Sequence, residues 1–213
     1  MGLQGLPPLE AFTYFLVLLV SVTVHEYGHA LAAIFEGDLT PTKNGKFVWN
    51  PLYYLNWIGF IMFLLIGFGF LGQVRTRPEL YRHGLLGEAL VSSAGILMNL
   101  TLVLLATLAL RLLDVHVVGN SLIGGNAPSW VVDALLTLFR LNVILAVFNL
   151  LPIPPLDGAH FLAAIIPGSV GQSLRHFLPQ SGYLAFFVLI LLQQPVGQFL
   201  GLVLDFAYTN LLK

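Results

Sequence analysis

Three residues of one short segment could together hold a metal ion and use it. In VTVHEYGHALAAIF, residues 22–35, His25 and His29 are four positions apart, so on a helix both imidazoles project from one face. Glu26 follows His25 directly and would lie within reach of a water molecule on such an ion. This HExxH arrangement is typical of zinc sites in which the carboxylate moves the proton of an attacking water. It predicts water-activating metal chemistry.

The composition of the chain is that of a membrane protein. Of its 213 residues 57% are hydrophobic and 9% are charged, with a mean hydropathy of +0.87, whereas a soluble domain carries roughly 25% charged residues. Polar groups at bilayer depth cost a few kcal/mol or more, so the HExxH residues need a compensating partner. The formal net charge of −1 gives no basic surplus, so we expect the lipid bilayer and no nucleic acid among the partners.

Five apolar segments are long enough to cross a bilayer as helices, which takes about 20 residues. They are residues 11–35, 52–72, 89–110, 130–151 and 182–204. We therefore predict an all-α polytopic membrane protein with about five to six transmembrane or re-entrant helices, in a single domain over residues 1–213. The first apolar segment follows no basic region, so we expect it to be retained and not removed as a signal peptide. The expected location is a bacterial cell membrane.

The connection LTPTKNGKFVWNP predicts a short membrane-associated β-hairpin over residues 39–50. Asn44-Gly45 suits a type I′ turn between strands at 39–43 and 46–50, and Pro41 would place the first strand at an edge. A polar loop with an incidental turn is the alternative.

Basic residues flank the segment 52–72 on both sides. Lys43 and Lys46 precede it, and Arg75, Arg77 and Arg82 follow it. The positive-inside rule draws both flanks toward the cytoplasm. Either the segment does not cross fully or one basic cluster lies on the opposite side.

A catalytic zinc site usually takes a third protein ligand, and a chain with no cysteine must supply it as His, Asp or Glu. Candidates at apparent membrane depth are Asp133, Asp157 and His160. Asp157 has the most unusual setting, because Pro152, Pro154 and Pro155 make FNLLPIPPLDGAH extended or irregular just before it. Such backbone is tolerated in a membrane only when it is buried in protein or lines a wet cavity. His160 is the rival ligand, since a helix opened by Gly158 would bring it to the same face.

Taken together, HEYGH and the downstream NLLPIPPLDG resemble the site-2 proteases, the intramembrane zinc metalloproteases. The family pattern Asn-x-x-Pro-x-Pro-x-Leu-Asp-Gly is matched by Asn149, Pro152, Pro154, Leu156, Asp157 and Gly158. By this resemblance His25, His29 and Asp157 would be the zinc ligands and Glu26 the catalytic base. SSAGILMNL, residues 92–100, is similar to the family's AGP-x-x-N segment with Ile96 in place of Pro. No stretch suggests a PDZ or CBS domain, so we expect a compact member.

The resemblance implies a zinc-dependent endopeptidase that cleaves within or near transmembrane helices, with single-pass membrane proteins as the expected substrates. The predicted hairpin and the irregular residues 151–155 are candidates for pairing with an unwound substrate as an added strand. Asn149, Pro152 and Pro154 are the candidate substrate-binding residues. Asn149 could instead cap a helix end.

Two polar residues and one glycine-rich stretch have a more ordinary interpretation. Asn99 and Asn142 are interpreted as interhelical hydrogen-bonding residues, because polar side chains commonly join membrane helices in this way. GFGFLG, residues 67–72, is interpreted as close helix packing and not as a binding loop.

Two other functions use some of the same residues. A membrane metal-ion transporter would explain the ligands but gives Glu26 no task and gives no reason for the Pro-rich segment beside Asp157. A non-catalytic binding protein on a protease scaffold would be expected to have lost the base or a ligand, and neither is lost here.

Overall fold

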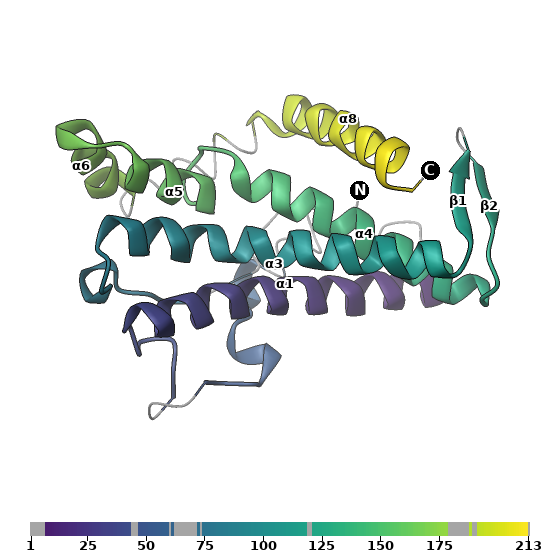
Figure 1. The fold of residues 1–213 in the computed structure, drawn as a ribbon, viewed down its shortest axis with the longest axis horizontal. Coiled ribbons are helices and arrows are strands. Elements are labelled where there is room, and N and C mark those ends of the chain that lie inside the picture. Colours follow the sequence, from purple (N-terminus) through teal and green to yellow (C-terminus); the bar gives the residue numbers. More distant parts are fainter. Residues whose placement is uncertain are drawn as a thin grey trace.

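Three long helices lying side by side form the body of the protein (Figure 1). They are α1 (Pro8–Glu36), α3 (Leu85–Leu112) and α4 (Ser129–Leu150). The computed structural model describes residues 7–43, 47–59, 61, 72, 74–118, 121–178, 188 and 191–212. Within those residues, these three helices are long and apolar enough to cross a membrane. Helices are therefore confirmed at the predicted segments 11–35, 89–110 and 130–151 to within a few residues.

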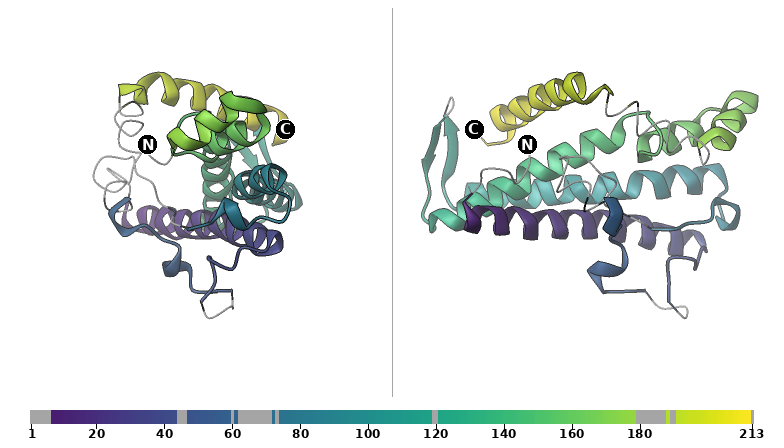
Figure 2. Two further views of the ribbon diagram at one scale, coloured as in Figure 1. Left: turned by 90° about the vertical axis from the view of Figure 1, so that its left-hand side faces the viewer. Right: turned by 180° about the vertical axis from the view of Figure 1, so that it is seen from behind.

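Shorter helices follow along the chain. They are α5 (Asp157–Ile165), α6 (Gly168–Phe177) and α8 (Gln193–Leu211), with 3₁₀ turns η1 (Pro51–Tyr53) and η2 (Pro78–Leu80) before α3. Helix α8 packs on α4, on the side away from α1 (Figure 2). Most of the predicted span 52–72 and the first part of 182–204 lie outside the described residues, so the count of five to six membrane helices stays a prediction.

Helices α1 and α3 approach closely where α1 carries the HEYGH motif. A Cβ added to Gly28 would lie 2.7 Å from the backbone oxygen of Ala94 and 2.7 Å from Cγ of Met98. Small residues allow such close backbone contact between membrane helices. Helix α3 runs unbroken through Ile96, whose backbone N–H is available for the helix where a proline would lack it.

The described ends of the segment 52–72 meet each other. Leu55 and Gly72 form an isolated antiparallel bridge. Beyond it the chain returns to the C-terminal end of α1, where the Asp38 carboxylate accepts a hydrogen bond from the Arg77 backbone N–H at 2.6 Å. At the same end the Glu36 carboxylate accepts one from the His83 backbone N–H at 3.1 Å. The chain therefore leaves α1 and returns to it at the same end, which brings Arg77 and Arg82 to the end that Lys43 closely follows.

A short β-hairpin is present, but at a different place from the one predicted. Strands β1 (Val115–Val118) and β2 (Ser121–Gly124) pair antiparallel with Val118 opposite Ser121. They lie at the end of α3 remote from α5 and α6 (Figure 1). Residues 39–43 and 47–50 contain no strand, apart from an isolated β-bridge at Lys43, and the predicted turn at 44–46 lies outside the described residues. The signal missed in the sequence is the dipeptide Gly119-Asn120, which favours a two-residue hairpin turn and follows the valine-rich residues 115–118.

Candidate metal centre

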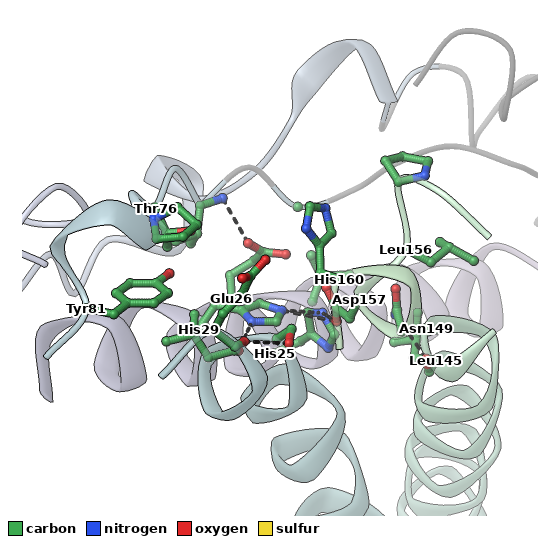
Figure 3. A pocket seen from close by; sticks show the side chains of 18 of the residues that line it. His25, Glu26, His29, Thr76, Tyr81, Leu145, Asn149, Leu156, Asp157 and His160 are labelled. Atoms are coloured by element: carbon green, nitrogen blue, oxygen red, sulfur yellow. Dashed lines mark hydrogen bonds and ion pairs between the residues drawn. The ribbon is translucent and has the colours of Figure 1, made fainter. Parts of the chain in front are cut away.

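The two histidines of α1 and the aspartate that begins α5 bring three donor atoms together (Figure 3). His25 Nε2 and His29 Nε2 are 3.1 Å apart, and each lies 3.2 Å from Asp157 Oδ2. Four donors arranged tetrahedrally at zinc distances of about 2.0–2.1 Å are about 3.3–3.4 Å apart. The three atoms therefore already have nearly the separation that a tetrahedral ion requires.

The hydrogen bonds of the two imidazoles direct their lone pairs to this point. His25 Nδ1 donates to Asn99 Oδ1 at 2.6 Å, and His29 Nδ1 donates to the backbone oxygen of Val91 at 2.8 Å. Both partners are acceptors only, so each Nδ1 carries the hydrogen and each Nε2 is left with a free lone pair. Asp157 Oδ2 faces both Nε2 atoms, is buried, and has no hydrogen-bond partner among the described residues. Three electron-rich atoms in contact fit a bound cation.

A buried hydrogen-bonded chain holds Asn99 in this orientation. Its Nδ2 donates to Asn142 Oδ1 at 2.7 Å, and Asn142 Nδ2 donates in turn to Ser21 Oγ at 2.8 Å. Asn99, Asn142 and Ser21 are all fully buried. The chain links α3, α4 and α1, so the interhelical role predicted for the two asparagines is confirmed. The sequence did not indicate that the same chain orients His25, as partners of metal-bound histidines usually do.

Helix α3 passes directly over the two imidazoles at Gly95. A Cβ at this position would lie 2.6 Å from His25 Cε1 and 2.7 Å from His25 Nε2, and it would also overlap His29 Nε2. Every other residue type has a Cβ, so the approach of α3 to the two imidazoles requires glycine here. The AGILMN segment thus contributes both Gly95 and Asn99 to the centre.

Glu26 lies beside the three donor atoms, and its carboxylate is held by the backbone N–H of Val74. Its Oε2 accepts a hydrogen bond from the Val74 N–H at 2.9 Å (Figure 3). A Cβ on Gly72 would overlap the same carboxylate. Gly72 is the one described residue of the GFGFLG stretch, and it makes this contact with Glu26; the other five lie outside the described residues.

A cavity of about 780 Å³ opens beside the three donor atoms. Its walls include Tyr81 and His160, and Pro155 and Leu156 from the irregular segment that links α4 and α5. Residues 151–156 contain no helix, as the prolines predicted.

Two titratable residues of the cavity wall are neutral. Burial raises the pKa of Tyr81 to about 12, so its phenol stays neutral. Burial lowers the pKa of His160, so its imidazole favours the neutral form.

The three predicted substrate-binding residues differ in whether they line the cavity. Asn149 lines the cavity, and its Nδ2 donates to the backbone oxygen of Leu145 at 3.0 Å within α4. Pro152 and Pro154 are not among the described residues that line it. His160 also lines the cavity, but the described residues whose donor atoms converge are His25, His29 and Asp157.

Comparison with known proteins shows the family of this chain. Residues 114–193 match peptidase family M50. The "Putative zinc metalloprotease YwhC" of Bacillus subtilis (strain 168) is 32% identical over 194 residues, covering 90% of this chain and 85% of the relative. This chain belongs to peptidase family M50. The resemblance to site-2 proteases is thereby confirmed, and family membership implies a protein substrate.

Two further relatives show the same degree of sequence identity. The "Putative zinc metalloprotease Rip2" of Mycobacterium tuberculosis (strain ATCC 25618 / H37Rv) is 32% identical over 194 residues, covering 87% of this chain and 69% of the relative. The protein of the same name from Mycolicibacterium smegmatis is 32% identical over 181 residues, covering 81% of this chain and 64% of the relative. No solved structure is significantly similar to this chain.

Proposed function

We propose that this protein is a zinc-dependent intramembrane endopeptidase that hydrolyses peptide bonds within or near transmembrane helices of its substrates. The observation that carries the proposal is the convergence of His25 Nε2, His29 Nε2 and Asp157 Oδ2, with Glu26 beside them, inside a bundle of apolar helices. Membership of peptidase family M50 and the names of the relatives support zinc as the metal.

In this proposal His25, His29 and Asp157 hold the zinc, with Asn99 and Val91 orienting the imidazoles. When bound, zinc polarises a carbonyl oxygen and makes water a better nucleophile. Glu26 takes the proton of the attacking water on its carboxylate and returns it to the amine nitrogen that leaves. The Val74 N–H keeps that carboxylate in place beside the ligands.

Asn149, Pro152 and Pro154 form part of the proposed substrate-binding region. One N–H of the Asn149 amide is used within α4, so its second N–H and its oxygen are available to substrate backbone. Pro152 and Pro154 keep residues 151–156 out of helix next to the cavity, where an unwound substrate could pair with them. Unwinding is required because a helix hides its carbonyl groups in its own hydrogen bonds.

The proposed setting is a bacterial cell membrane, crossed several times by one protease domain over residues 1–213, with single-pass membrane proteins as substrates. The bacterial origin of the relatives supports this setting. We assign the C-terminal end of α1 to the cytoplasm, because Arg77 and Arg82 are hydrogen-bonded to residues at that end and Lys43 follows it closely in the chain.

The test is cleavage of a model transmembrane substrate by the purified chain in lipid. Glu26→Gln should abolish cleavage and keep about one zinc per chain, because a base is removed and no ligand. His25→Ala should lose both zinc and cleavage. Because Glu79 is exposed, Glu79→Gln is the matched control and should behave as the wild type. A metal-ion transporter would tolerate Glu26→Gln, so unchanged proteolysis or unchanged metal flux in that variant would contradict the proposal.

A further inference from the structure

A second acidic residue faces the cavity and has no role in the chemistry described above. Glu88, one turn into α3, is 8% exposed and lines the cavity together with the metal-centre residues. A buried carboxylate is costly unless a cation or several hydrogen-bond donors compensate it.

In the described part of the chain the only compensating charge on this carboxylate is that of Arg175, which acts at a distance and without a salt bridge. No side chain or backbone N–H there donates a hydrogen bond to the Glu88 carboxylate, and none forms an ion pair with it. Ser92 Oγ donates at 2.6 Å to the backbone oxygen of Glu88 and not to its carboxylate. Arg175 of α6 lies on the same cavity, but its guanidinium donates to the backbone oxygen of Ala163. The carboxylate is thus open toward the cavity.

We propose that Glu88 is a subsite for a basic side chain, lysine or arginine, of the substrate. The proposal rests on the proposed proteolytic function. Cytoplasmic flanks of transmembrane helices are rich in Lys and Arg. Glu88 begins α3 at the same end of the bundle as the basic residues of this chain, next to Gly87, whose added Cβ would lie 2.6 Å from Glu36 Oε2. A substrate held in the cavity would therefore present a basic residue to Glu88.

The geometry of α3 predicts how many residues separate that basic residue from the scissile bond. Glu88 precedes Gly95, which covers the two imidazoles, by seven residues, or about 10 Å along the axis of α3. An extended chain advances about 3.3 Å per residue. The basic side chain should therefore stand about three residues from the scissile bond, on the side that leads to the start of α3.

The experiment uses the zinc-loaded full chain in proteoliposomes and substrates with Lys, Gln or Glu at each of the four positions on either side of the scissile bond. In the wild type, Lys should exceed Glu in kcat/KM by about tenfold or more at one position near the third, mainly through KM. Glu88→Gln should reduce that ratio to about one to threefold, and Glu88→Lys should invert it. Arg175→Gln should increase it, because a competing cation is removed.

Glu79→Gln removes an exposed carboxylate that lines the same cavity and should keep the wild-type ratio. A Lys preference that survives in Glu88→Gln, or one that is lost equally in Glu79→Gln, overturns the subsite. The preference for Lys can also be measured without turnover, by comparing how the same substrates bind to the Glu26→Gln variant and to the Glu26→Gln/Glu88→Gln double variant. A Lys preference in binding without any cleavage by the wild type would leave the subsite standing and contradict the proteolytic function.

Discussion

Replacing Gly95 by alanine tests whether the imidazoles are held by the close approach of α3. The added methyl group would lie 2.6 Å from His25 Cε1, where a non-bonded contact requires about 3.5–4.0 Å. The ring or the helix must therefore withdraw by about 1 Å. Metal-ligand distances tolerate only about 0.2 Å. We expect the dissociation constant for zinc to rise by about 100-fold or more, which corresponds to about 2.7 kcal/mol.

The assay is competition for zinc against a chromophoric chelator, with the purified protein in detergent micelles. Two glycine replacements serve as controls. Gly201→Ala in α8 meets nothing within 4 Å and should bind zinc as the wild type does. Gly28→Ala crowds the same pair of helices at Ala94 and Met98 without overlapping an imidazole, so it should weaken binding less than Gly95→Ala. If Gly95→Ala matched Gly201→Ala, the close approach would have no part in holding the ligands.

Three further predictions concern the ligand set and the topology. Asn142→Leu removes the acceptor of Asn99 and should weaken zinc binding about 10- to 100-fold by competition titration, while an unchanged affinity would exclude the buried chain as a positioning device. Asp157→Ala should lose most bound zinc by elemental analysis and His160→Ala should keep it; the reverse order would make His160 the ligand. Because the chain has no cysteine, single cysteines at Arg77 and His116 should be labelled from opposite sides of the membrane, and labelling from one side would contradict the assigned topology.

The sequence predicted the parts of the centre that depend on local spacing. The pair His25 and His29 share a helix face by their spacing alone, and the long helices follow from apolar length. Asp157 could be singled out because prolines interrupt the helical pattern just before it, although its choice over His160 also needed the family resemblance. Each of these features is encoded in consecutive residues of one segment.

The supporting contacts depend on residues far apart in the chain. Asn99 reaches His25 across 74 positions, and an asparagine in an apolar helix looks the same whether it joins helices or orients a ligand. The Val74 contact to Glu26 uses a backbone N–H, which every non-proline residue has, so no residue type could indicate it. The family resemblance marked the segment of Gly95 but not its contact with the imidazoles, which arises only when α3 lies against α1.

The buried chain from Ser21 through Asn142 and Asn99 to His25 also couples ion binding to folding. It joins α1, α3 and α4, so their separation would release the hydrogen bond that orients a ligand. By mutual linkage, an ion that binds only the assembled bundle must stabilise it, by about 2.7 kcal/mol when the free ion is at 100 times its dissociation constant. Chelation should therefore lower the resistance of the three helices to unfolding together, and amide hydrogen exchange along them should report the occupancy of the centre.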